Sequence, residues 1–209
     1  MRISIIITTL SNRTNYTLES LCGLRKYLNY ELIIIRNIYN ASRARNLGVA
    51  KATSDIIAIL DDDLKFNIKD FIFLLSKLKK GKCVWSSGTQ IMYRSDFISV
   101  GGFNERVFKV YQEDMEFLER LKSKGLKVEF YHEKIKHLGG QFSWNKLFLI
   151  RFNTPLVLLE YKPKMLLKVF IEGFLAKHPL RWLLNFAFIF GLFYHMIKLQ
   201  FSSRNSFGW

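Results

Sequence analysis

Three consecutive aspartates, Asp61, Asp62 and Asp63, directly follow the apolar run at residues 56–60. Such a run predicts an interior strand of a parallel sheet, and ligands of open α/β sheets bind outside the carboxyl ends of strands. Crowded carboxylates repel one another unless a cation shares the site, and Mg²⁺ is typically held by one or two carboxylates together with substrate oxygens. The aspartates therefore indicate a site for a divalent cation and a diphosphate.

The chain up to about residue 131 alternates strand-like and helix-like segments. Apolar, β-branched runs predict strands at residues 3–9, 31–35, 56–60, 83–85 and 127–131. Helical spacing predicts helices at residues 16–27, 42–53, 68–79 and 112–124, with Ser42 as an N-cap and Gly125 closing the last helix. Residues between 86 and 111 are expected to form a loop. This order predicts an α/β fold with a doubly wound, mostly parallel sheet flanked by helices.

The net charge of +15 points to an anionic partner: nucleic acid, a membrane surface or a phosphorylated substrate. Nucleic acid is disfavoured, because most phenylalanines cluster in long apolar runs and do not alternate with Lys or Arg on a polar surface. The two cysteines, Cys22 and Cys83, both lie in apolar patterns. They predict buried thiols in a reducing compartment and no disulfide framework.

Composition changes after residue 140, and the chain divides into an α/β domain at 1–140 and a helical segment at 141–209. The segment is aromatic, aliphatic and basic, and its acidic residues are Glu160 and Glu172. Residues 182–197 are nearly all apolar but fall short of the roughly 20 residues that a spanning helix needs. We expect this segment to lie on or partly enter an anionic membrane surface, with simple packing on the domain as the alternative.

A second group of functional residues begins at Gly101 and Gly102 and continues at Glu113 and Asp114, where the last predicted helix of the domain starts. Acidic residues are common in first helical turns, where they complement the helix dipole. A carboxylate near a metal-diphosphate site is also what deprotonating an acceptor hydroxyl requires. Asp114 therefore has two interpretations from the sequence: an acidic residue that complements the helix dipole, and a base that deprotonates an acceptor hydroxyl.

In their order along the chain, these motifs resemble those of family 2 glycosyltransferases. The matching segments are residues 5–9, 44–48, 60–63, 101–105, 113–114 and His137. The resemblance covers roughly residues 1 to 140. It implies the GT-A fold and an inverting, hexosyltransferase-like transfer from a nucleotide diphosphate sugar to a hydroxyl group.

The resemblance also implies roles for individual residues. Asp61 and Asp63, with His137, would hold Mg²⁺ or Mn²⁺. The donor would be bound by Thr9, Asn37, Arg45, Asp61 and Asp62. Asp114 would act as the catalytic base beside Glu113, and the acceptor would contact Gly101, Gly102 and Glu113.

The sequence departs from the family after the second predicted strand. Arg36 and Asn37 stand where the family usually places an acidic turn that reads the donor base, so the base is left open. The stretch between Asp63 and Gly88 is also short for the family. The basic, aromatic segment at 141–209 fits a glycan or lipid-linked acceptor at the cytoplasmic face of the membrane. Two alternatives are a catalytically impaired homologue and a GT-A-like nucleotidyltransferase. The latter is disfavoured because residues 9–13 lack the glycine-rich loop that it expects.

Overall fold

The computed structural model describes residues 2–10, 14–105, 112–139, 144–175 and 179–204. The chain divides into two compact units. The first consists of Met1–Lys109 and Phe117–Gln141, and the second consists of Val110–Glu116 and Phe142–Trp209. The first unit is α/β and the second is helical.

Six strands of the first unit form one sheet in the order β2-β1-β3-β6-β5-β7. They are β1 (Arg2–Thr9), β2 (Asn29–Arg36), β3 (Ile56–Asp61), β5 (Lys82–Ser86), β6 (Thr89–Tyr93) and β7 (Lys127–Phe130). Neighbouring strands pair in parallel except at β6, which is antiparallel to β3 and β5. Because β1 lies between β2 and β3, the strand order reverses there, and the carboxyl ends of β1 and β3 form the kind of crevice in which α/β sheets bind ligands. The prediction of an α/β fold with a mostly parallel sheet is confirmed.

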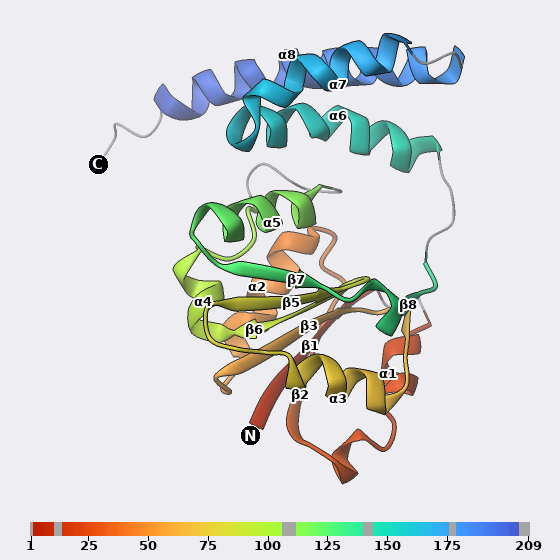
Figure 1. The fold of residues 1–209 in the computed structure, drawn as a ribbon, viewed down its shortest axis with the longest axis vertical. Helices are drawn as coiled ribbons and strands as arrows, with labels where there is room; N and C mark the ends of the chain where they lie inside the picture. The colour runs from red at the N-terminus through yellow and green to blue at the C-terminus, as the bar shows by residue number, and fades with distance from the viewer. Residues whose placement is uncertain (1, 11–13, 106–111, 140–143, 176–178, 205–209) are drawn as a thin grey trace. The chain divides into compact units, whose positions relative to one another are not determined.

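Helices cover both faces of this sheet (Figure 1). The first core cluster includes alternate β1 residues such as Ile5 together with residues of α1 (Tyr16–Ser20), η1 (Leu24–Lys26) and α3 (Ile68–Ser76). The second includes the opposite β1 residue Ile6 and residues of α2 (Ala41–Lys51), α4 (Arg94–Ser99) and α5 (Glu113–Ser123). Both clusters exist because successive side chains of a strand point to opposite faces.

Two short strands extend the carboxyl edge of the sheet. β4 (Leu64–Lys65) follows the aspartates and pairs antiparallel with β8 (Lys136–His137), which comes after the 3-10 helix η2 (His132–Lys134). Leu64 is the register partner of His137. This pairing brings together two segments that are more than seventy positions apart in the sequence.

The structure corrects four details of the sequence interpretation. The segment expected to be a loop after residue 86 contains β6 and α4. The helix predicted at 16–27 is instead α1 followed by η1, because Gly23 adopts φ +84° between them. The N-cap of α2 is Asn40, whose side chain accepts a hydrogen bond from the backbone N–H of Arg43 at 3.0 Å, and not Ser42. Cys22 is exposed, although Cys83 is buried as predicted.

The helical unit contains α6 (Trp144–Tyr161), α7 (Pro163–Leu175) and α8 (Pro179–Arg204). Leu156 of α6 and Phe188 of α8 are almost completely buried. The two helices pack closely, since a methyl group added at Gly191 would lie 1.9 Å from the backbone oxygen of Phe152. Among the described stretches of the chain, no helix combines the length and the apolar character needed to cross a membrane.

Candidate functional site: an aspartate and histidine group at the sheet edge

The three aspartates lie where β3 ends at the carboxyl edge of the sheet. The middle one, Asp62, is only 4% exposed, and the hydroxyl of Thr9 at the end of β1 donates to its Oδ2 at 2.5 Å. Thr17 is fully buried beneath the same turn, where its hydroxyl donates to the backbone oxygen of Asp61 at 2.6 Å and accepts from the N–H of Leu64 at 3.0 Å. These bonds fix the backbone of the turn, and the one from Thr9 ties Asp62 to the end of β1.

The outer aspartates share a histidine. Nε2 of His137 lies 2.8 Å from Oδ1 of Asp63 and 3.8 Å from Oδ2 of Asp61. The backbone of the histidine strand is tied to the same turn, because the N–H of Leu138 donates to the backbone oxygen of Asp63 at 2.8 Å. One ligand atom from each of Asp61, Asp63 and His137 lies within 4.8 Å of the other two. We call these three residues the aspartate–histidine group.

The donor atoms of this group fit a divalent cation. Ligand atoms around a cation with bonds of about 2.1 Å are separated by roughly 3–4 Å, which matches the two distances to His137. Two carboxylates favour a hard cation such as Mg²⁺ or Mn²⁺, and a single imidazole is compatible with the latter. The side chains are partly exposed, so the group has access to solvent and to substrate.

A buried arginine lies beside the group. Arg45 of α2 is 4% exposed, and its guanidinium donates to Oδ1 of Asp61 at 2.9 Å. The guanidinium carbon also lies 5.1 Å from the ring centre of Phe103, a cation–π distance. Arg45 therefore orients Asp61 and supplies positive charge at the edge of the sheet where a diphosphate would bind.

Two glycines from separate loops pack against the two outer carboxylates. A methyl group added at Gly139 would lie 1.6 Å from Oδ2 of Asp63, and one added at Gly88 would lie 2.8 Å from Oδ2 of Asp61. The backbone oxygen of Gly88 also accepts from the N–H of Asp61 at 2.9 Å. Any larger side chain at either position would displace a carboxylate of the aspartate–histidine group.

Asn46 of α2 holds the loop that carries Gly101 and Gly102. Its side chain accepts from the N–H of Phe103 at 2.8 Å and donates to the backbone oxygen of Phe103 at 2.9 Å and to Glu105 at 2.7 Å. Gly101 and Gly102 have φ values of +83° and +66°, which glycine adopts without strain. The loop is thus fixed next to Arg45, from the neighbouring position of the same helix.

The position corresponding to a base-reading turn is occupied by Asn37. It follows β2, has φ +59°, and donates its backbone N–H to the oxygen of Thr9 at 3.0 Å. Asn37 and Thr9 therefore end neighbouring strands at the same edge as the aspartates.

Glu113 and Asp114 lie in the first turn of α5, where both are half-buried. This turn belongs to the second compact unit, whereas the rest of the helix from Phe117 belongs to the first. Further along the helix, Phe117, Leu118 and Leu121 are buried. The structure brings Thr9, Asn37, Arg45, the three aspartates and His137 together at the edge of the first unit.

The sequence itself decides the family. Residues 5–136 match the profile of Glycosyl transferase family 2. The chain belongs to this family. It is a glycosyltransferase, and the resemblance inferred from the motifs is confirmed.

A solved glycosyltransferase shares the fold. The catalytic domain of Drosophila beta1,4galactosyltransferase 7, solved in complex with xylobiose, aligns with a TM-score of 0.56 at 16% identity and covers 72% of this chain and 80% of that one. A mutant of the same Drosophila enzyme, in complex with manganese, UDP-Gal and xylobiose, aligns at 0.49 and 17% identity over 70% and 79%. TarS from S. aureus aligns at 0.48 and 13% identity, over 77% of this chain and 39% of that one. Comparison with proteins of curated function gives no match.

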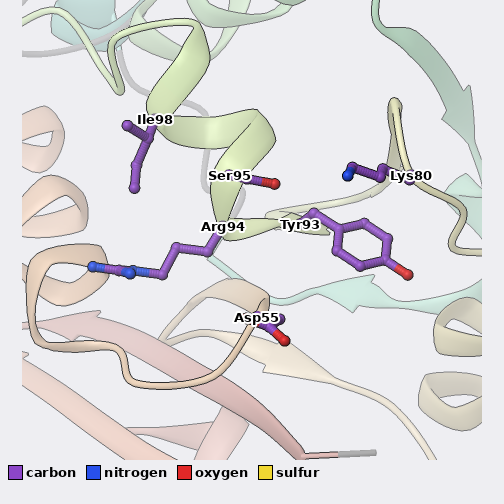
Figure 2. Close-up of a pocket in the computed structure, with 6 residues that line it drawn as sticks. All are labelled: Asp55, Lys80, Tyr93, Arg94, Ser95 and Ile98. Carbon is purple, nitrogen blue, oxygen red and sulfur yellow. The ribbon is translucent and has the colours of Figure 1, made fainter.

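A separate cavity of about 370 Å³ lies elsewhere on this glycosyltransferase. It is lined by Asp55, Lys80, Tyr93, Arg94, Ser95 and Ile98 (Figure 2). Asp55 precedes β3 and Asp61 ends it, so the cavity is at the opposite edge of the sheet from the aspartate–histidine group. Figure 2 shows the side chain of Arg94 extending away from Tyr93 and Lys80, so the cations do not converge on one point.

Three residues at the site of this glycosyltransferase were missed by sequence reasoning as contacts of functional side chains. They are Gly88, Gly139 and Asn46, which contact Asp61, Asp63 and the Gly101–Gly102 loop, respectively. Asn46 falls inside the matching segment 44–48 and Gly139 follows His137 by two positions, and this proximity to the motifs is the signal that could have identified them. Gly88 stands in a two-residue turn between β5 and β6, a hairpin that was not predicted.

Proposed function

We propose that this glycosyltransferase inverts the anomeric centre of a sugar as it moves the sugar from a nucleotide diphosphate donor to a hydroxyl group of a glycan or lipid-linked acceptor. The aspartate–histidine group at the carboxyl edge of β1 and β3 is the observation that supports this proposal. It combines cation ligands with a buried arginine at the place where α/β sheets bind ligands.

Asp61, Asp63 and His137 would hold Mg²⁺ or Mn²⁺. Bound there, the cation would stabilise the charge that develops on the leaving diphosphate. Arg45 adds a positive charge beside Asp61, to which it donates a hydrogen bond. Asp62 accepts a hydrogen bond from Thr9 and so keeps the turn in place. The ends of β1 and β2 at Thr9 and Asn37 would contact the nucleoside.

Asp114 would accept the proton of the acceptor hydroxyl while the oxygen attacks the anomeric carbon and the bond from that carbon to the diphosphate breaks. No covalent enzyme intermediate is needed. Glu113 would contact the acceptor from the adjacent position. Gly101 and Gly102 would let the acceptor approach the backbone closely, because neither carries a side chain.

Donor binding is tested by thermal melting with Mn²⁺ or Mg²⁺ and one of UDP, GDP or dTDP. One of these nucleotides should raise the melting temperature, and Asp63→Ala should abolish the increase. Asp55→Ala is the matched control, since it removes an exposed carboxylate at the opposite edge of the sheet. If no nucleotide changes the melting temperature of the wild-type protein, the donor site is refuted.

The base is tested by Asp114→Asn. This variant should bind the donor nucleotide like the wild type but lose transfer, because an amide cannot accept the proton at neutral pH. Full transfer activity in Asp114→Asn would refute the assignment of the base.

We also propose that residues 141–209 form a membrane-associating segment of a catalytic domain at 1–140, and that the protein acts at the cytoplasmic face of a membrane. Five exposed residues recur with helical spacing along α8: Phe186, Phe190, Phe193, Tyr194 and Ile197. Phe190 is 66% exposed. Large exposed apolar faces of this kind are typical of helices that lie in the plane of a bilayer interface.

The charge of the helical unit supports an anionic surface as its partner. Lys162, Lys164 and Lys168 are exposed at α7, and the residues after 141 contain only two acids. Each basic side chain near an anionic bilayer contributes about 1 kcal/mol of attraction. A neutral apolar partner would not use this excess of positive charge.

Flotation of the full chain with vesicles tests the membrane proposal. Binding should be stronger to vesicles that contain phosphatidylserine than to neutral ones. Phe190→Ser with Phe193→Ser should weaken it at least about 100-fold, since burying one phenylalanine is worth about 1.5–3 kcal/mol and the variant removes two. Phe130→Ser, at an exposed phenylalanine of the first unit, is the control. Unchanged flotation of the double variant would overturn the proposal. Self-association of the wild-type chain without vesicle binding would overturn it as well.

A further inference from the structure

A hydrogen bond between a half-buried tyrosine and a buried glutamate joins α6 to the first turn of α5. Tyr161 is the last residue of α6, and its hydroxyl donates to Oε1 of Glu116 at 2.9 Å. Glu116 is only 1% exposed. Both residues belong to the second compact unit, in which Val110–Glu116 groups with the C-terminal helices.

The glutamate of this pair is two positions from Asp114, in the same helical turn. The turn is closed by a hydrogen bond from the N–H of Glu116 to the backbone oxygen of Gln112 at 2.9 Å. Gln112 has φ +72°, a left-handed conformation that non-glycine residues adopt only when their surroundings enforce it. The backbone that carries Asp114 is therefore held between a strained residue before it and a partly buried hydrogen bond after it.

A buried carboxylate is costly unless hydrogen bonds satisfy it. Burial, and then the hydrogen bond and charge of Glu116, raise the pKa of the Tyr161 hydroxyl, so the phenol stays protonated and remains a donor. Hydrogen bonds to charged groups are stronger than neutral ones and fix geometry more tightly. Packing alone does not require this polar contact. A phenylalanine and a leucine would fill the same space without the desolvation cost of a buried carboxylate.

We infer that Tyr161 and Glu116 are positioning residues for Asp114, so that α6 supports the turn that carries the proposed base. The inference rests on the proposed function, in which Asp114 accepts the proton of the acceptor. A turn that carries a catalytic base must be held within about 0.5 Å of its productive geometry. The Tyr161 hydroxyl provides that restraint from α6.

The test is Tyr161→Phe in the full chain, which removes one oxygen atom and keeps the ring. We expect kcat to fall about tenfold, with the donor KM and the affinity for Mn²⁺ and nucleotide within twofold of wild type, because a small displacement of a catalytic group has large kinetic effects. Hydrogen–deuterium exchange should increase in the peptide that covers residues 112–117 and stay unchanged in the peptide that covers residues 61–64.

Tyr131→Phe is a matched control. The hydroxyl of Tyr131 donates to Oε2 of Glu129 at 2.8 Å, so this variant removes the same type of bond in the first unit. It should leave kcat unchanged. Glu116→Gln should retain most of kcat, because its amide oxygen can still accept from Tyr161, whereas Glu116→Leu should lose it together with the exchange protection.

Two kinetic results overturn the inference: a kcat of Tyr161→Phe within twofold of wild type, or a parallel loss of kcat and donor affinity, which indicates a general structural role. Failure of the proposed function gives a different pattern. Full activity in Asp114→Asn refutes the base itself, whereas unchanged exchange at residues 112–117 in Tyr161→Phe refutes the positioning contact whatever the role of Asp114.

Discussion

Gly139→Ala is a direct test of the site geometry, because it adds a single methyl group against a carboxylate. The new carbon would lie 1.6 Å from Oδ2 and 2.6 Å from Cγ of Asp63. Gly139 has no positive φ, so alanine is compatible with its backbone. The substitution therefore affects the carboxylate and not the chain conformation.

The size of the effect follows from these distances. The Asp63 oxygen must move by roughly 1.8 Å to reach ordinary van der Waals separation from the methyl group. Metal sites tolerate deviations of only about 0.2 Å from their ideal distances. We expect the affinity for Mn²⁺ to fall about 10- to 100-fold, as for the loss of residues that orient metal ligands, which is ~1.4–2.7 kcal/mol.

Calorimetric titration of Mn²⁺, with and without the donor nucleotide, measures this affinity. Asp63→Ala sets the limit of complete ligand loss, and Gly139→Ala should not exceed it. Gly81→Ala is the control, since nothing lies within 4 Å of the added methyl group while φ is +74°. Gly81→Ala should lose stability without losing affinity for Mn²⁺. Gly139→Ala should lose affinity for Mn²⁺ without losing stability.

An affinity for Mn²⁺ within twofold of wild type, in a Gly139→Ala protein with an unchanged melting temperature, would falsify this reasoning. It would mean that Asp63 is not a ligand or that its carboxylate has a second position of equal quality. A large fall in melting temperature without any change in metal affinity would contradict it equally.

Three further predictions concern stability and reactivity. Burial raises the pKa of Glu31, but hydrogen bonds from Ser4, Thr53 and Ser54 outweigh it and lower the pKa from 4.5 to about 2. The stability that ionised Glu31 gives the folded protein is therefore complete above about pH 4.5 and is lost as the pH falls toward 2. In urea unfolding, Glu31→Gln should cost about 2–3 kcal/mol at pH 7 and much less at pH 3, and an equal cost at both would contradict this. Cys22 should react with a thiol reagent in the native protein while Cys83 does not, because burial raises the pKa of the Cys83 thiol. Rapid reaction of both thiols would disprove this. Asn46→Ala should destabilise the protein by about 2–3 kcal/mol and raise amide exchange at residues 101–105, since it removes three hydrogen bonds of that loop, and unchanged exchange would refute this.

The parallel strands of the sheet could be predicted because they are buried on both faces and therefore form uninterrupted apolar runs. β6 could not, since its sequence begins with Thr89 and Gln90, and Gln90 is 1% exposed in spite of its polarity. A short antiparallel strand of mixed composition has neither an apolar run nor a clean alternation. The same limit applied to α4, which has only six residues.

The members of the aspartate–histidine group could be predicted from the order of the motifs, but their contacts could not. The distance from His137 to Asp63 depends on the pairing of β4 with β8, each two residues long and without a recognisable pattern. Cys22 was predicted to be buried because its neighbours are apolar. It is exposed because the helix ends before it, which breaks the periodicity on which the prediction relied.

Arg45 has a consequence for the folded state of the enzyme when the proposed cation is not bound. Since the guanidinium is built into the protein beside Asp61, part of the negative charge of the site is neutralised at all times. A chelator should therefore inactivate the enzyme without unfolding it, and addition of Mn²⁺ should restore activity within the time of mixing. In a cell, such an enzyme could persist folded through periods of metal shortage and resume transfer without new synthesis.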